Sequence, residues 1–307
     1  MMGTVIAGRY RLRRSIGRGA MGEVFEAVDE DERGAPVAVK VLHEEHCKDK
    51  KFCARFSREA EIAGRIHSPH VAGVLGAGLN RQERLWIVFE YLPGESLLAC
   101  VQREGKLKFG DVAWVVDQAL HGLDAAHQCG IVHRDVKLSN LFLEQLVGGV
   151  RRLRVLDFGV ARLLPSEGAV SLPSDGATSS SLASRLTTFG VPIGSPVYMS
   201  PEQIFHARDA DERADLYGLG ITAYGLLTGR LPFEQADVGS LIDAKCSRPA
   251  PTLTEVSGAA WPSILEGWLA HMVAINRNER FDSARAALDA WTSVCAAIPD
   301  GQERENR

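Results

Sequence analysis

Acidic, basic and amide side chains crowd one short stretch of the chain, residues 131–141, which reads IVHRDVKLSNL. Asp135 carries a carboxylate that can accept a proton from a hydroxyl group. Lys137 follows closely, so its ammonium can stabilise negative charge in the same region. Asn140, and Asp157 in a VLDFGVA run, offer the oxygen ligands that Mg²⁺ prefers. These motifs together could accept a proton, stabilise negative charge and bind a hard cation.

A glycine-rich turn lies near the start of the chain, where residues 16–24 read IGRGAMGEV. Gly17, Gly19 and Gly22 have no Cβ, so backbone N–H groups can approach phosphate oxygens closely. Taken alone, the spacing fits a tight hairpin as well as a phosphate site. The next residues favour a strand rather than the helix of a dinucleotide-binding unit. The pattern predicts a hairpin folded over phosphates, with Val24 covering the base.

One lysine interrupts the apolar run VAVK at residues 37–40. Burying it is costly unless it is paired, although a lysine that reaches back to water is the simpler alternative. The predicted helix that follows offers Glu59 and Glu61, and residues two apart point to different helix faces. We favour Glu59 as the partner that holds Lys40 in place to neutralise phosphate charge.

The elements that must position these groups change in character along the chain. Strands are predicted at residues 10–16, 23–29, 36–42 and 85–91, with one amphipathic helix at 50–66. After Gly94 the apolar spacing favours helices, at 109–130 and from residue 210 to 298, with short strands at 131–132, 141–143 and 154–156. The pattern predicts a small β-rich lobe followed by a larger α-rich lobe, with a hinge near residues 90–95.

Bulk properties narrow the classes further. The 307 residues include 35 Lys and Arg against 39 Asp and Glu, and this near balance supports neither a nucleic-acid surface nor a polybasic membrane face. The six cysteines form no CxxC pair and read as scattered thiols of a reducing compartment. The longest apolar stretch, residues 216–229, is too short to span a bilayer. We therefore expect a soluble cytoplasmic protein.

The order of these motifs resembles that of eukaryotic-like (Hanks-type) serine/threonine protein kinases, particularly their bacterial branch. The glycine-rich turn, VAVK, HRDVKLSN and DFG carry the resemblance, which covers about residues 8–298 and leaves 299–307 as a charged tail. It implies an α+β, bilobal protein-kinase-like fold, with a small lobe at about 8–92 and a large lobe at about 95–298. It also implies ATP and Mg²⁺ as cofactors and Ser/Thr hydroxyls of proteins as acceptors.

The resemblance places the nucleotide between the lobes. Backbone groups of Glu90 and Leu92 are expected to bond the adenine edge, and Phe89 to narrow the space behind it. Ser96, or less favourably Glu95, is expected to bond the ribose. The expected nucleotide contacts are Ile16, Gly17, Arg18, Gly19, Ala20, Met21, Gly22, Glu23, Val24, Ala38, Lys40, Phe89, Glu90, Leu92 and Ser96.

Residues 194–202, GSPVYMSPE, resemble the family segment that docks the protein substrate. Ser195 stands where Thr is usual and is expected to bridge Asp135 and Lys137. Ser200 stands where Ala is usual. Lys137 is also typical of serine/threonine rather than tyrosine kinases.

Three residues are expected to support this region. Asp215 matches the helix carboxylate that ties down the catalytic-loop backbone, and Glu202 is expected to pair with Arg280. Leu138 and Arg277 replace prolines that are usual in the family, and we expect neither change to abolish activity.

Arg134 matches a residue that meets a phosphate on the activation segment, and Thr187 and Thr188 are the favoured carriers. The alternative is that the Ser/Thr-rich insert at residues 163–188 is only a flexible linker. We predict that the chain is activated by autophosphorylation at Thr187 or Thr188. Self-association of two copies, with transfer in trans, is an open option. The other functions considered are a pseudokinase or scaffold, which retention of Lys40 and the two aspartates disfavours, and a small-molecule phosphotransferase.

Overall fold

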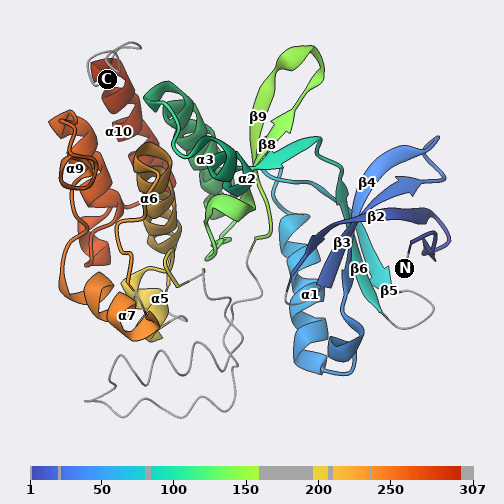
Figure 1. The fold of residues 1–307 in the computed structure, drawn as a ribbon. Coiled ribbons are helices and arrows are strands. Elements are labelled where there is room, and N and C mark those ends of the chain that lie inside the picture. Colours follow the sequence, from blue (N-terminus) through green and yellow to red (C-terminus); the bar gives the residue numbers. More distant parts are fainter. Residues whose placement is uncertain are drawn as a thin grey trace.

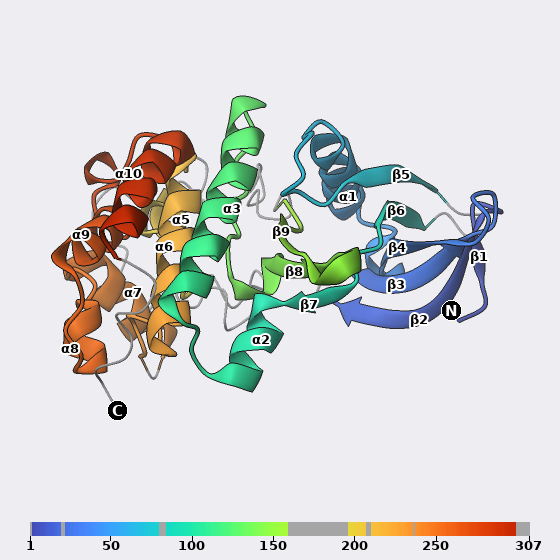
Figure 2. The same ribbon diagram turned by 90° about the horizontal axis from the view of Figure 1, so that it is seen from above.

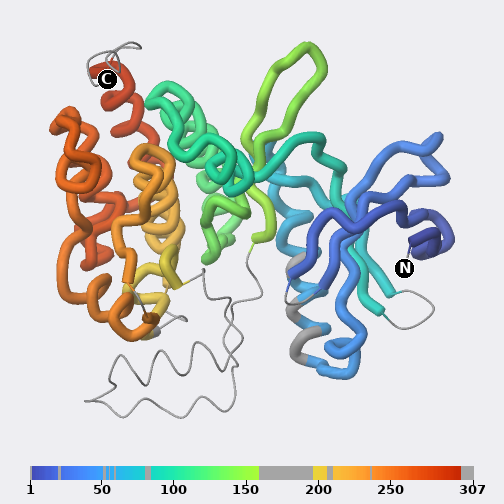
Figure 3. The backbone as a smooth tube through the Cα atoms, viewed as in Figure 1, coloured from blue at the N-terminus to red at the C-terminus, as the bar shows by residue number. Residues whose placement is uncertain are grey.

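A computed structural model describes residues 2–19, 22–79, 84–158, 196–206, 210–235 and 237–298 (Figure 1). These residues form two lobes, a small one built on a sheet and a larger one built of helices. The link between them is short, because one strand ends at Glu90 and the next begins at Gly94. The tube view in Figure 3 follows the chain through this link from one lobe to the other.

The small lobe contains a six-stranded antiparallel sheet in the order β1-β2-β3-β4-β6-β5. Its strands are β1 (Val5–Ile6), β2 (Tyr10–Arg18), β3 (Gly22–Asp29), β4 (Ala35–Leu42), β5 (Val74–Leu79) and β6 (Leu85–Glu90). Successive side chains of a strand point to opposite faces of the sheet. Val39 and Val41 of β4 therefore pack in a core with Phe25, while Ala38 and Lys40 face the cleft.

One helix, α1 (Lys50–Ala63), packs against this sheet. Its residues Phe56 and Ala60 form a buried cluster with Leu42 and Ile87. The amphipathic spacing thus places one apolar stripe on the sheet. The helix ends three residues before the predicted limit at residue 66.

A small antiparallel sheet of the order β7-β8-β9 lies where the lobes meet (Figure 2). Its strands are β7 (Gly94–Ser96), β8 (Leu141–Gln145) and β9 (Arg151–Val155). Val155 also forms an isolated parallel bridge with Val71, and Ala72 N donates to Val155 O at 3.1 Å. These bonds fix the end of β9, which leads directly into Asp157.

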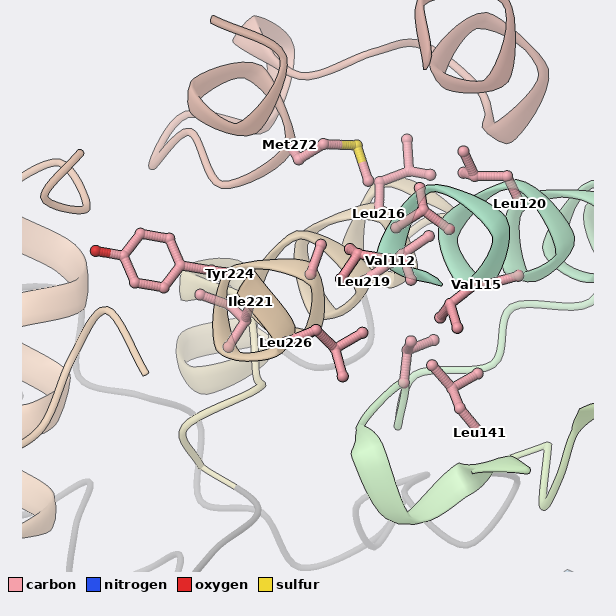
Figure 4. Packing of buried hydrophobic residues seen from close by; sticks show 14 of the residues in the cluster. Val112, Val115, Leu120, Leu141, Leu216, Leu219, Ile221, Tyr224, Leu226 and Met272 are labelled. Atoms are coloured by element: carbon pink, nitrogen blue, oxygen red, sulfur yellow. The ribbon is translucent and has the colours of Figure 1, made fainter. Parts of the chain in front are cut away.

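The large lobe is organised around α6 (Arg213–Thr228), whose residues from Ala214 to Leu227 are all buried. The helices around it are α2 (Leu97–Glu104), α3 (Phe109–Gln128), α5 (Pro201–His206), α7 (Val238–Ser247), α8 (Leu253–Ser257), α9 (Ser263–Met272) and α10 (Ala284–Ala297). Figure 4 shows side chains of α6 and α3 packed into one core. Gly218 of α6 also lets the catalytic loop approach this helix closely, since a Cβ there would lie 2.8 Å from Val136 O.

The predicted bilobal architecture is confirmed, with two differences. The strand predicted at residues 131–132 is wrong, because that stretch has no regular structure. Strands β1, β5 and β7 and helix α2 were not predicted. The insert at residues 163–188 and the tail at 299–307 lie outside the described residues. No helix in the described ranges is long and apolar enough to cross a membrane.

Candidate active site

A pocket opens between the two lobes, and both contribute to it. It is lined by Ile16, Val24, Ala38, Lys40, Ala63, Ala72, Phe89, Glu90, Tyr91, Leu92, Phe142, Val155, Leu156, Asp157 and Phe158. Seven of the predicted nucleotide contacts are therefore in its wall. Apolar walls with a few convergent polar groups are typical of sites for planar organic ligands.

The charged end of the pocket holds Lys40 and Asp157. Lys40 Nζ donates to Asp157 Oδ1 at 3.1 Å, and the Lys40 side chain is only 13% exposed while that of Asp157 is 51% exposed. The Lys40 ammonium holds the pKa of Asp157 below its usual range, so this carboxyl stays ionised. The side chain of Glu59 lies outside the described set, so the Lys40–Glu59 pair stays a prediction.

The catalytic loop gathers the three groups that its spacing predicted. Lys137 Nζ donates to Asp135 Oδ2 at 2.7 Å. Asn140 Nδ2 donates to Asp135 Oδ2 at 3.1 Å and to its backbone oxygen at 2.9 Å. Lys137 and Asn140 therefore orient the Asp135 carboxylate. The two bonds to Asp135 also hold the side-chain amide of Asn140 in place.

The backbone of this loop is held by the carboxylate of Asp215 on α6. Its two oxygens accept from His133 N at 2.8 Å and from Arg134 N at 2.6 Å, and His127 Nε2 lies 2.8 Å from it. Buried N–H groups need a partner, and here a charged side chain replaces a strand neighbour. Ile131 N donates to Ala126 O near the end of α3 at 3.0 Å, so at residues 131–132 this N–H is not available to a strand neighbour.

His133 links the catalytic loop to the segment that carries Asp157. Its Nε2 lies 2.9 Å from Leu156 O, and its ring centre lies 4.7 Å from that of Phe158. Both side chains are buried. They act as packing residues that hold the two halves of the charged site together.

The docking segment, which the structure describes from residue 196 to 202, is tied to the same loop. Ser200 N donates to Gln203 Oε1 at 3.0 Å, and Gln203 Nε2 donates to Arg134 O at 2.9 Å. Arg280 forms the predicted pair with Glu202, with two hydrogen bonds of 2.6 and 2.9 Å. The activation-segment residues Thr187, Thr188 and Ser195 lie outside the described residues.

Arg134 has positive φ, 63°, and its guanidinium donates to Ala210 O at 3.1 Å. Its Nε is buried and has no hydrogen-bond partner among the described residues. The side chain therefore retains unused donor capacity next to the catalytic loop.

The glycine-rich turn is the hairpin that the sequence predicted, since β2 and β3 pair antiparallel and Gly19 N donates to Gly22 O at 2.9 Å. A Cβ on Gly22 would collide with Val41 O of β4, so this glycine is required by the sheet itself. Gly17 and Gly19 have room for a Cβ. Ala20 and Met21 at the tip lie outside the described residues.

The pocket wall and the predicted contacts differ at several residues. Ser96 and Glu95, the predicted ribose contacts, are not among the lining residues; Ser96 caps α2 by accepting from Ala99 N at 3.2 Å, and Glu95 pairs with Arg103. Phe142 does belong to it, and its place two residues after Asn140 was the available signal. The sequence neighbours of Glu90 and Asp157 are also in the wall and carried a comparable signal, namely Tyr91, Val155, Leu156 and Phe158. Ala63 and Ala72 carried none.

A buried arginine behind the hinge was also missed. Arg154 on β9 is 4% exposed, pairs with Glu90, and donates to Pro69 O at 2.9 Å. Glu90 Oε1 in turn accepts from Gly73 N at 2.6 Å. The hinge strand, the loop before β5 and the small sheet are thus bonded into one unit.

The family of the chain follows from this geometry together with sequence comparison. Residues 10–289 match the family model described as the protein kinase domain. The serine/threonine-protein kinase pkn3 of Myxococcus xanthus is 35% identical over 286 residues, which cover 93% of this chain and 50% of that protein. The serine/threonine-protein kinase PknD of Mycobacterium tuberculosis is 34% identical, with 93% and 40% covered.

Solved structures agree. The crystal structure of the Mycobacterium tuberculosis PknI kinase domain superposes with a TM-score of 0.69 at 29% identity, covering 96% of this chain and 99% of that one. The chain belongs to the protein kinase family. It spans half or less of the length of the curated relatives just described. Membership of the family implies use of ATP and a divalent metal ion.

Proposed function

We propose that this chain is a protein serine/threonine kinase that transfers the γ-phosphate of ATP to Ser/Thr hydroxyls, with residues 8–298 as one catalytic unit. The observation that carries the proposal is the cluster of Asp135, Lys137 and Asn140, held by Asp215 beside the charged end of the pocket. A pseudokinase or scaffold is the alternative. It is disfavoured because Lys40 and both aspartates are present and oriented.

Adenine fits the apolar part of the pocket. Ile16, Val24 and Ala38 of the small lobe supply one face, and Phe142 of β8 supplies the other. Glu90 N already donates to Gly73 O at 3.1 Å, so a bond from Glu90 to the base would come from its carbonyl. Leu92 N is the second proposed hinge contact to the base.

The phosphates are assigned to the turn and to Lys40. Gly17 and Gly19 have space that no protein atom requires, which suits the close approach of a phosphate group. Lys40 supplies positive charge between this turn and Asp157. The proposed metal ion is Mg²⁺, a hard cation that neutralises phosphate charge when bound.

The donor set fits such a cation. Asn140 donates to Asp135 through its Nδ2. Its amide oxygen accepts from Ser139 Oγ at 3.4 Å and has a second lone pair for a metal, and Asp157 offers an ionised, half-exposed carboxylate. Both groups are oxygen donors without a thiol or imidazole among them, as Mg²⁺ prefers. The residues present therefore fit the ion that the family uses.

Asp135 is assigned to the acceptor. Its carboxylate orients the incoming hydroxyl and takes the proton as the phosphoryl group is transferred. Lys137, 2.7 Å from Asp135, stabilises the negative charge that the transferred group carries. The proton thus moves to a carboxylate that two donors already hold in place.

Regulation and location complete the proposal. Phosphorylation of Thr187 or Thr188 by a second copy would supply charge to the unused donor of Arg134. A cytoplasmic location follows from the need for ATP. The regulatory part is tested by comparing untreated wild type with phosphatase-treated protein and with a Thr187→Ala/Thr188→Ala variant. Rates of the last two that match the untreated wild type would contradict it.

The central test is transfer of labelled phosphate from ATP with Mg²⁺ to dephosphorylated casein. Wild type should label Ser and Thr, and Asp135→Asn, the matched control, should bind ATP without efficient transfer. Wild type that binds ATP but labels nothing would favour the scaffold alternative. Replacing Mg²⁺ by Ca²⁺, which has the same charge but is larger, should lower the rate.

A further inference from the structure

A lysine lies buried beneath the docking segment. Lys245 on α7 is 0% exposed. Its Nζ donates to Pro196 O at 3.2 Å and to Val197 O as well. These carbonyls and the faces of two aromatic rings are its partners among the described residues, and none of them is a carboxylate.

Such a lysine is not explained by packing. Burial strips water from the ammonium, which is costly, and it lowers the pKa of Lys245 to about 7. Methionine would fill a similar volume without this cost. What lysine supplies, and methionine does not, is a set of N–H donors that can serve two carbonyls at once. Its ammonium has three donors and its neutral amine has two, so both forms can make both bonds.

The groups around Lys245 form a buried stack. Its Nζ lies 5.0 Å from the centre of the Tyr217 ring and 5.9 Å from that of Phe233. Arg280 lies over the same Tyr217 ring at 4.9 Å and pairs with Glu202. Two buried cations thus share one ring of α6, one fixing the end of the docking segment and the other fixing its start.

The segment is also tied to the catalytic loop through Gln203, which bonds Ser200 and the backbone of Arg134. Arg134 is the neighbour of Asp135. The docking segment is therefore bonded to α7 through Pro196 and Val197, and to the catalytic loop through Ser200. The position of the Pro196–Val197 backbone relative to Asp135 therefore depends on its hydrogen bonds to Lys245 of α7.

We propose that Lys245 is a positioning residue for the protein acceptor. Its two hydrogen bonds hold the Pro196–Val197 backbone in a fixed position, and the polypeptide substrate lies against this backbone. This rests on the proposed kinase function. Lys245 is not part of the nucleotide pocket wall, so its effect is confined to the acceptor side.

The test compares Lys245→Met with Lys106→Met, a control that removes an exposed lysine from the same lobe. Loss of two hydrogen bonds should raise the KM for dephosphorylated casein about tenfold in Lys245→Met. The KM for ATP should stay within about twofold, because the pocket is unchanged. The midpoint of unfolding should stay equal or rise, since a buried charge is removed. Lys245→Arg keeps the donors and should restore part of the casein affinity.

A role in stability alone predicts the opposite pattern, with a lower unfolding midpoint and an unchanged casein KM. That result would overturn the proposal, as would failure of Lys245→Met to fold or equal rises in both KM values. Hydrogen exchange at Val197 to Met199 gives a readout independent of activity and should be faster in Lys245→Met. If wild type transfers no phosphate, the kinase proposal fails, and unchanged exchange then rejects the anchoring role separately.

Discussion

The two walls of the cleft are built from different materials. The nucleotide wall comes from the pleated strands β3, β4 and β6, whose side chains alternate between core and cleft. The acceptor wall comes from irregular backbone at residues 131–137 and 196–200. Strands satisfy their own N–H and C=O groups, whereas loops must borrow partners. The acceptor wall therefore depends on buried polar anchors, namely Asp215, Gln203, Lys245 and the pair of Arg280 with Glu202.

This difference teaches where each wall is vulnerable. On the nucleotide wall, the alternation of β4 delivers Lys40 to the cleft while Val39 anchors the strand, so position and stability rest on different residues. On the acceptor wall, one buried polar residue often determines both the position of the backbone and its stability. Changes to the first wall should thus separate affinity from folding. On the second wall, changes to the buried ion pair of Arg280 and Glu202 should couple them, whereas Lys245, which bonds backbone carbonyls rather than a carboxylate, is the expected exception.

The largest expected effect is on the acceptor wall. Asp135→Asn should lower kcat by about 10²–10⁴, the usual contribution of a positioned general base. Its affinity for ATP should stay near that of wild type, because Asp135 is absent from the pocket wall. Steady-state rates and nucleotide binding measured on the same samples check this. A kcat near wild type would remove Asp135 from its assigned role.

Lys40→Met removes the positive charge that the nucleotide wall carries. Loss of one charge-stabilising donor typically costs about 10²–10³ in rate. Folding should persist, since the side chain lies on the cleft face of β4 and methionine replaces it without burying a new polar group. Transfer rates and circular dichroism test the two halves of this expectation. Turnover like that of wild type would contradict it.

Arg280→Met tests whether the acceptor wall couples folding to position. The Arg280 side chain is 0% exposed and that of Glu202 is 14% exposed. Removing one partner of a buried pair leaves an uncompensated charge and costs about 3–5 kcal/mol. Urea unfolding measures this loss, and the double variant Arg280→Met/Glu202→Leu should recover part of it. A loss below about 1 kcal/mol, the range of exposed pairs, would be the opposing result.

Phe89→Gly probes the apolar part of the nucleotide wall. Phe89 lines the pocket on β6, and we expect its ring to limit the space behind the base. ATP-competitive inhibitors with a bulky group aimed at that space should bind about tenfold better in the variant, since each buried methylene contributes about 0.8 kcal/mol. Competition assays compare the two proteins, with a small inhibitor as control. Equal inhibition would show that Phe89 does not limit this space.

The smallest effect concerns pH and the buried amine of the acceptor wall. Burial lowers the pKa of Lys245 from 10.5 to about 7. Between these values the unfolded chain holds a proton that the folded chain has released, so the free energy of unfolding rises with pH in that window. The charged neighbours Arg280 and Glu202 oppose one another there. Lys245→Met should lose this part of the slope, which urea unfolding near pH 7 and pH 9 measures.

The sequence by itself determined the two-lobe order of elements, the glycine hairpin and the spacing of Asp135, Lys137 and Asn140. These features depend on local periodicity and on residues a few positions apart. It also identified Asp215, Glu202 and Arg280 through a motif resemblance.

Only the tertiary structure decided which distant groups meet. Residues 131–132 lead into a loop rather than forming the expected strand, and the next residue, His133, donates its N–H to a carboxylate 82 residues away. Arg154 and Lys245 read as ordinary polar residues in the sequence, yet both are buried against backbone carbonyls. The free energy of a buried charge depends on which partners surround it, and that is set by packing between elements rather than by neighbours along the chain.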